Sequence, residues 1–195
     1  MASREEILGA LRAARPPAAP LPDARPAPTP LPDPAGRLAA AVAAVGGTLV
    51  RVPDAAALAA EVVSLAARVG AASFASLVPG LPGTFPLAPD GDPHALDGLG
   101  LAVLPGDFAV AENGAVWVPG ARLRPRALFV IAEHLALVVP AGEVVDDMHE
   151  AYGRVRFDGD GFGVFISGPS KTADIEQALV IGAHGARSCV VFLVG

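Results

Sequence analysis

The stretch VFISGPSKTADIEQALVIGAHGARSCVVFLV, residues 164–194, decides the fold that the sequence predicts. It opens and closes with β-rich apolar runs, and the residues between them have the pattern of a tight turn followed by an apolar helix. The helix would begin near Thr172 and end at Gly185. Three of its apolar residues would face a sheet: Ile175, Leu179 and Val180. A strand, a turn, a helix and a strand in this order predict a parallel β–α–β unit.

The first half of the globular region has the same alternation of helices and strands. Asp33 and Asp54 are placed as N-caps of apolar helices that Gly46 and Gly70 would end. Further strands are predicted in four apolar runs, 48–52, 73–78, 99–104 and 134–140. This alternation predicts an α/β fold, a three-layer α/β/α arrangement with a mostly parallel sheet.

Three other segments have their own signals. DFAVAENGAVWVPG, residues 107–120, alternates on both sides of Asn113-Gly114, which predicts a β-hairpin with a tight turn. RLRPRALFVIAE, residues 122–133, is ambiguous between a short helix and a strand, and GEVVDDMHEAY, residues 142–152, has the pattern of a helix.

The N-terminal region differs from the rest. Residues 3–14 predict a short helix that Ser3 caps, and the stretch 16–34 contains nine prolines. Proline lacks an amide donor and fixes the backbone, so this stretch predicts a semi-rigid tether. We therefore expect two parts, 1–34 as helix and tether and 35–195 as one α/β domain.

Composition limits the classes of function. The chain of 195 residues is 52% hydrophobic with a net charge of −6, which argues against a nucleic-acid or anionic-membrane surface. Acidic residues near the start and broken apolar runs predict a cytoplasmic protein without a membrane span. The single cysteine, Cys189, lies in an apolar run, so we expect it to be a buried structural thiol. One cysteine cannot hold an iron–sulfur cluster alone.

The turn at 167–176 is the first candidate site. Gly168 allows close approach of the backbone, and a helix start beside Lys171 would point free amides at a phosphate or carboxylate. The spacing of a P-loop is absent, so a merely capped helix is the alternative.

The hairpin tip AENG is the second candidate. Glu112 would be displayed beside exposed amides as a nucleophile, a base or a hydrogen-bond acceptor, or it would be a solvated turn residue.

Scattered histidines and acids give a third set: His134, Asp146, Asp147, His149, Glu150 and His184. Without an H-E-x-x-H pattern, a solvated helix face is favoured over a metal site, and we expect no metal. His184 would suit the C-terminus of the predicted helix. Three arginines, Arg122, Arg124 and Arg126, either serve solubility or border a cleft that binds an acid.

SGPSKTADIEQALVIGAHG resembles the C-terminal signature of the LUD-domain family, the C-type lactate-utilisation proteins. VAENGAVWV lies where that family has an Ala-Glu-[Thr/Asn]-Gly hairpin, and EHLALVV is similar to its His-led strand. The resemblance covers roughly residues 100–195 well and the remainder in outline. It implies a fold like that of the ribose-5-phosphate isomerase, glucosamine-phosphate deaminase and CoA-transferase group.

The resemblance also implies a role in oxidation of L-lactate to pyruvate, in a system whose partner subunits carry the iron–sulfur clusters. This chain would then be the non-redox subunit and hold no cofactor of its own. It would bind a small anion or a partner through residues of the turn, the hairpin and the His-led strand: Gly168, Ser170, Lys171, Thr172, Asp174, Glu176, Asn113, Gly114 and His134.

Two alternatives stay open. Certain CoA-transferases place a nucleophilic Glu in a Glu-Asn-Gly motif, which AENG reproduces, so Glu112 would be catalytic in an enzyme of that kind. An assembly protein without a ligand, docking through its N-terminal helix, is the other.

Overall fold

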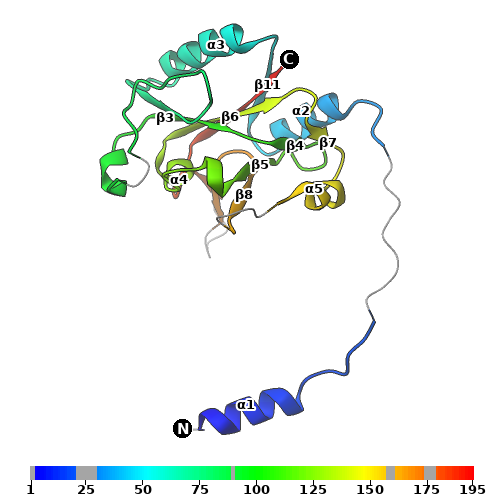
Figure 1. Ribbon diagram of the computed structural model, residues 1–195. Helices are drawn as coiled ribbons and strands as arrows, with labels where there is room; N and C mark the ends of the chain where they lie inside the picture. Colours follow the sequence, from blue (N-terminus) through cyan, green and yellow to red (C-terminus); the bar gives the residue numbers. More distant parts are fainter. Residues whose placement is uncertain (1–2, 21–29, 89–90, 157–160, 174–178) are drawn as a thin grey trace.

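The protein has a central parallel sheet. A helix covers one face of this sheet, and a second sheet lies on the other face (Figure 1). The structure is a computed structural model that describes residues 3–20, 30–88, 91–156, 161–173 and 179–195. The α/β class and the mostly parallel sheet predicted from the sequence are confirmed.

The central sheet has five strands in the order β1-β11-β6-β3-β2, and all neighbours are parallel. Their bounds are Thr48–Val52 for β1, Phe74–Ser76 for β2, Leu101–Pro105 for β3, His134–Pro140 for β6 and Ser188–Val194 for β11. Every residue of β3 is buried, as expected for a strand covered on both faces.

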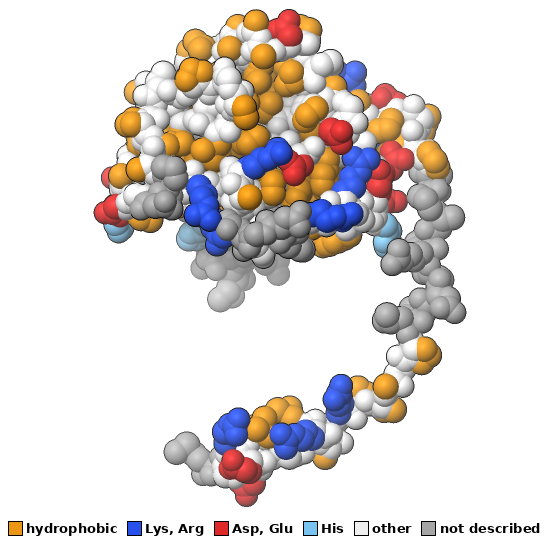
Figure 2. Space-filling model, in the orientation of Figure 1, with side chains coloured by type: hydrophobic (Ala, Val, Ile, Leu, Met, Phe, Trp, Pro, Cys, Tyr) orange, Lys and Arg blue, Asp and Glu red, His pale blue; other side chains and the backbone are white. Residues whose placement is uncertain are grey.

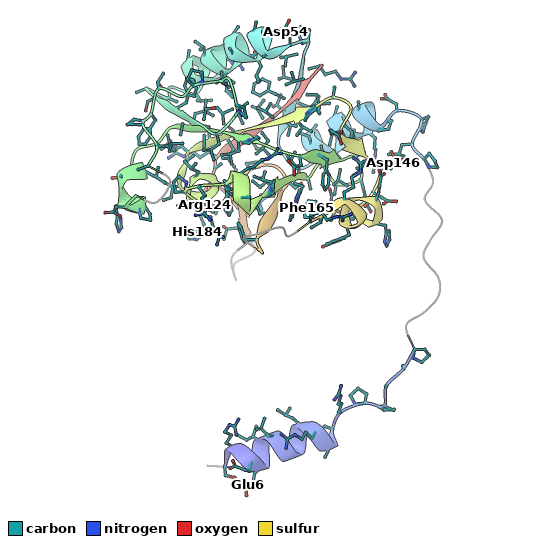
Figure 3. The ribbon with its side chains drawn as sticks, viewed as in Figure 1. Glu6, Asp54, Arg124, Asp146, Phe165 and His184 are labelled. Atoms are coloured by element: carbon teal, nitrogen blue, oxygen red, sulfur yellow. The ribbon has the colours of Figure 1, made fainter. Side chains whose placement is uncertain are left out.

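One face of the sheet is covered by α3, Ala55–Arg68. Asp54, labelled in Figure 3, caps this helix because its side chain accepts from the amide of Ala57 at 2.8 Å. Buried α3 residues such as Leu58 and Val62 pack against sheet residues such as Phe192. Gly70 ends the helix with φ of 70°, which a glycine adopts without a steric cost.

The other face carries α2, Pro34–Ala44, together with a second sheet. This sheet has the order β7-β4-β5-β8, with β4 at Phe108–Val110, β5 at Val116–Pro119, β7 at Val144–Val145 and β8 at Gly163–Ile166. The predicted Asn113-Gly114 hairpin joins β4 and β5 and is confirmed. The layer opposite α3 is thus part helix and part sheet, which the sequence did not indicate.

The outer face of the second sheet is covered by α5, Met148–Arg154. Trp117 and Phe165 pack there with ring centroids 4.7 Å apart. Asp146, which precedes α5 and is labelled in Figure 3, accepts from the amide of Leu31 at 3.0 Å and so joins α5 to the segment before α2.

The remaining elements are short or lie at the periphery. They are α1 at Arg4–Ala13, the 3-10 helices η1 at Pro93–Leu96 and η2 at Gly120–Arg122, and α4 at Leu128–Ile131. Ser3 and Glu6 form the predicted capping box of α1, and this helix buries none of its residues. Figure 2 shows hydrophobic side chains among scattered charged ones on the visible face and along α1. Among the described residues, no helix has both the length and the apolar character needed to cross a membrane.

The predicted helix after the 167–171 turn is wrong. Lys171–Ala173 forms β9 and Leu179–Ile181 forms β10, and the two pair as an antiparallel two-stranded sheet. A run of Leu, Val and Ile satisfies a strand as well as a helix, and here the backbone pairs with its own chain instead of lying on the central sheet. Leu179 and Val180 are exposed, so neither faces the sheet, and Ile175 lies outside the described residues.

The helix predicted at 142–152 starts later than expected. Val144–Val145 pairs with β4 as the short strand β7, and the helix begins only at Met148. The Asp147 side chain accepts from the amide of Glu150 at 2.8 Å, which places the N-cap at Asp147.

Candidate functional site

The turn after β8 lies against the end of α2. Gly168 has φ of 70°, and a Cβ at this position would lie 2.5 Å from the carbonyl oxygen of Val45. No side chain fits in that space without movement of backbone, so glycine is required by the packing of the turn on α2. The Ser167 hydroxyl donates to the carbonyl of Asn113 at 2.9 Å, which joins this turn to the AENG hairpin.

Lys171 is directed at the helix end and not at an open anion site. Its ammonium donates to the carbonyl oxygens of Val45, the C-cap of α2, and of Pro169. A cation at a helix C-terminus meets the negative end of the helix dipole. The helix start that would have offered free amides beside Lys171 is strand β9, where Thr172 pairs with Val180. Asp174 and Glu176 lie outside the described residues.

The hairpin tip is bound to its surroundings at each of its three residues. Glu112 accepts from the amide of Met148 at 2.9 Å, at the first residue of α5. The Asn113 side chain accepts from the amide of Ala115 at 3.0 Å. Gly114 has φ of 71°, and a Cβ there would lie 2.9 Å from the amide nitrogen of Val42 in α2. The motif thus fixes the hairpin between α2 and α5.

His134 begins β6, at the amino edge of the central sheet. Its Nδ1 lies 2.7 Å from the Ser188 hydroxyl at the start of β11. Burial lowers the pKa of His134, Glu133 opposes this, and Arg187 lowers the pKa further. Glu133 and Arg187 lie 3.5 Å apart as an exposed ion pair.

A cavity of about 230 Å³ opens beside the turn. Of the predicted ligand-binding residues that the structure describes, only Gly168 and Ser170 line it. His184, labelled in Figure 3, also lines it, but it follows strand β10 and does not end a helix as we expected. Glu112, Lys171 and His134 do not line this cavity, so the structure joins the turn to the hairpin without forming the common cleft that we expected.

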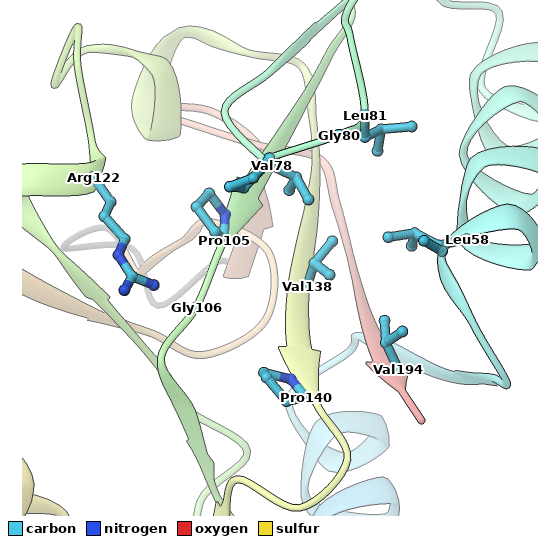
Figure 4. A pocket seen from close by; sticks show the side chains of 12 residues that line it. Leu58, Val78, Gly80, Leu81, Pro105, Gly106, Arg122, Val138, Pro140 and Val194 are labelled. Atoms are coloured by element: carbon cyan, nitrogen blue, oxygen red, sulfur yellow. The ribbon is translucent and has the colours of Figure 1, made fainter.

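Two larger hollows lie at the carboxyl edge of the parallel sheet, and Figure 4 shows the first of them. The first, of about 300 Å³, is lined by the ends of β3, β6 and β11 and by the first turn of α3. The second, of about 540 Å³, is lined by Arg122 and Arg124. Because both include Pro79, Pro105 and Arg122, we treat them as one carboxyl-edge cavity. Arg122 thus borders a cavity, which is one of the two roles that the sequence left open for the three arginines.

Sequence reasoning missed the apolar residues of the carboxyl-edge cavity, among them Leu58, Leu81 and Val138. One signal was present, because Pro105 and Pro140 end two of the predicted parallel strands. In an open parallel sheet, the carboxyl ends of the strands are where ligands bind. Among the described residues, no three His, Cys, Asp or Glu side chains gather as metal ligands would.

Comparison with known proteins places this geometry in a family. The LUD domain family matches residues 101–194. "Lactate utilization protein C" of Shouchella clausii is 32% identical over 91 residues, which are 44% of this chain and 40% of the relative. The protein of the same name from Geobacillus kaustophilus is 31% identical over 94 residues, 45% of this chain and 39% of the relative. The match thus spans about two fifths of the length of these relatives.

One solved structure has the same fold. A DUF162 family protein from Deinococcus radiodurans superposes with a TM-score of 0.58 at 16% identity, over 85% of this chain and all of the other. At that identity, the likeness concerns the fold alone. The matched residues contain β3, β6 and β11, the AENG hairpin and the turn at Gly168. Residues 101–194 of this chain match the LUD-domain family.

Proposed function

We propose that this protein is a non-redox subunit of a system that oxidises L-lactate to pyruvate. The observation that carries the proposal is the likeness of residues 101–194 to proteins named Lactate utilization protein C. The segment that resembles them contains three central strands and both sequence motifs, so it includes the part of the fold in which a shared activity would reside.

The division of labour follows from the chemistry of cysteine. Iron–sulfur clusters need several Cys thiolates, and this chain has one cysteine. Cys189 is 2% exposed, and burial raises its pKa to about 12, so the thiol stays protonated at neutral pH. We therefore assign the clusters, and the electron transfer, to partner subunits.

The partner subunit would dock beside the GPSKTADIE turn. β10 presents three aliphatic side chains to solvent, with Leu179 63%, Val180 46% and Ile181 51% exposed. Contiguous exposed apolar side chains mark interaction surfaces, and β10 has a single described neighbour strand, β9. A partner that covers these side chains would remove them from water.

A small anion at the turn is the alternative occupant. Ser170 lines the 230 Å³ cavity and would donate a hydrogen bond to it. Lys171 would have to exchange its bonds to the carbonyls of Val45 and Pro169 for the ligand. That exchange costs the anion part of its binding energy, so the geometry favours the partner.

The test is a pull-down of the tagged chain from lactate-grown cells of its own source. We expect the eluate to contain iron–sulfur protein, seen by its visible absorption, and to reduce a dye only when lactate is added. The double substitution of Leu179→Ser with Ile181→Ser should abolish the dye reduction. Val63→Ser changes a side chain that is 61% exposed on α3, away from β10, and is the matched control.

Two results would contradict the proposal. An eluate without lactate-dependent dye reduction would contradict the assignment to a lactate-oxidising system. Equal activity in the β10 variant and the Val63 control would contradict docking at β10, but it would leave the assignment to a lactate-oxidising system unchanged.

The CoA-transferase alternative is tested separately. Glu112 lines neither the 230 Å³ cavity nor the carboxyl-edge cavity, and its carboxylate bonds the amide of Met148. Transfer would require an acyl-CoA-derived adduct on this carboxylate. Mass spectrometry of the Glu112 peptide after incubation with a panel of acyl-CoAs should show no added mass, and a mass increase there would favour the transferase.

The assembly alternative predicts a different truncation result. Removal of residues 1–29 deletes α1, which buries nothing, but keeps Leu31 and its bond to Asp146, so it should leave the fold intact. If partner binding is lost in the truncated chain and kept in the β10 variant, docking belongs to the N-terminal helix.

A further inference from the structure

We propose that the carboxyl-edge cavity binds a short-chain aliphatic carboxylate, with the carboxylate at Arg122 and the chain among the apolar side chains behind it. This site is separate from the turn and from β10, so the inference goes beyond the proposed function and does not depend on it.

The position of the cavity follows from the sheet. Pro105 ends β3, Pro140 ends β6 and Val194 ends β11, and all three line the hollow. Parallel strands end at one edge, and the chain that leaves each of them opens a crevice there. Figure 4 shows Val138 and Val194 on one wall and Leu58 and Leu81 across from them.

The inner part of the cavity is apolar. Leu58, Leu81 and Val138 belong to the core cluster beneath α3 and are between 3% and 9% exposed. Their surfaces in the cavity are fixed by the packing of the core, so an aliphatic chain would meet a formed surface and not one that must order on binding. Each methylene buried there should strengthen binding by about fourfold.

The charge at the rim is positive. Arg122 and Arg124 are the charged side chains that line the cavity, and none of the described lining residues is Asp or Glu. Because both charged side chains that line the cavity are cations, the rim favours an anion.

Arg122 has an acidic partner but still has donors for a ligand. Its Nη1 lies 2.6 Å from Oδ1 of Asp107, and the side chains are 59% and 35% exposed. A guanidinium has five N–H donors, so one carboxylate does not exhaust it. An exposed pair of this kind is worth little by itself. Asp107 therefore holds the guanidinium in place and also competes with a ligand carboxylate for it.

The competition gives two substitutions with opposite effects. Arg122→Gln removes the charge-assisted bonds and should weaken hexanoate binding by about tenfold or more. Asp107→Asn removes the competing charge and should strengthen it several-fold. Arg68→Gln is the matched control, because Arg68 is also an exposed arginine paired with an acid, Glu61, and lies outside the cavity.

The experiment is calorimetric titration of the full chain with butanoate, hexanoate and 1-hexanol. Circular dichroism and Trp117 fluorescence check that each variant is folded. We expect hexanoate to bind more tightly than butanoate and hexanol, Arg122→Gln to bind weakly, and Arg68→Gln to match the unsubstituted protein. No heat of binding at millimolar hexanoate, equal affinity for hexanol, or equal affinities in the two arginine variants would overturn the proposal.

Discussion

Replacing Gly114 with alanine tests whether AENG is a structural motif. At φ of 71° an alanine costs about 1–2 kcal/mol relative to its preferred backbone, and fewer unfolded conformations return about 0.5 kcal/mol. The new Cβ would lie 2.9 Å from the amide nitrogen of Val42 and 3.0 Å from the carbonyl carbon of Ala41. These are backbone atoms of α2, and moving them costs about 1–3 kcal/mol. We expect Gly114→Ala to lower the free energy of unfolding by about 2–4 kcal/mol.

Urea titration followed by Trp117 fluorescence measures this loss. Trp117 is the single tryptophan and lies in β5 of the same hairpin, 4% exposed. Gly70→Ala is the control, because Gly70 has φ of 70° and a Cβ at this position would have no neighbouring atom within 4 Å, so it should lose only about 1 kcal/mol. Equal losses in the two variants would refute the close approach of the hairpin to α2.

Three further predictions concern single side chains. Lys171→Met removes the cation at the C-terminus of α2 and should lower the free energy of unfolding by about 0.5–1 kcal/mol, whereas Lys171→Arg should retain most of it; urea titration decides. Cys189 should not react with a thiol reagent at neutral pH until urea unfolds the chain, because the buried thiol has its pKa raised to about 12; rapid labelling of the folded protein would contradict its burial. In the folded chain the pKa of His134 is below its ordinary value of 6.5, so the unfolded chain binds the proton more readily. The stability that His134 contributes above pH 6.5 should therefore be lost as the pH falls through the folded pKa. His134→Gln should flatten this part of the plot of urea midpoint against pH, and an unchanged plot would contradict the prediction.

Local signals predicted much of the fold. The caps Asp33 and Asp54 act through bonds to residues three positions later, and the Asn113-Gly114 turn joins adjacent strands, so neighbouring sequence contains the information. The second sheet was not predicted, because Val116 pairs with Ile166 across about fifty residues of intervening chain and its strands are too short for a periodic pattern.

The candidate site failed where it depended on a helix. Ile175, Leu179 and Val180 have the spacing of a buried helix face, yet Leu179 and Val180 pair as a strand with Ala173 and Thr172. Apolar periodicity over so few residues does not separate the two structures. Three predictions depended on this helix: the free amides, the helix-capping role of Thr172 and the place of His184 at a helix end. All three are wrong because the described residues of this segment form strands instead. The contact of Ser167 with Asn113 does not depend on the helix.

The two surfaces that the structure brings forward have different chemistry, and this difference constrains how the protein acts. β10 offers aliphatic side chains without charge, which suits a protein partner and gives a small polar substrate nothing to bond. The carboxyl-edge cavity offers a cation at the mouth of an apolar hollow, which suits a small acid.

In the parallel sheet, β11 connects these two surfaces, since it begins just after the β10 segment and Val194, at its end, lines the cavity. A partner that covers β10 would bind a segment separated by six residues from the start of this buried strand, whose other end lines the carboxyl-edge cavity. If titration with hexanoate gives the same affinity with and without the partner, the two surfaces act independently. A changed affinity would mean that binding of the partner and of the acid are coupled, by the same factor in both directions.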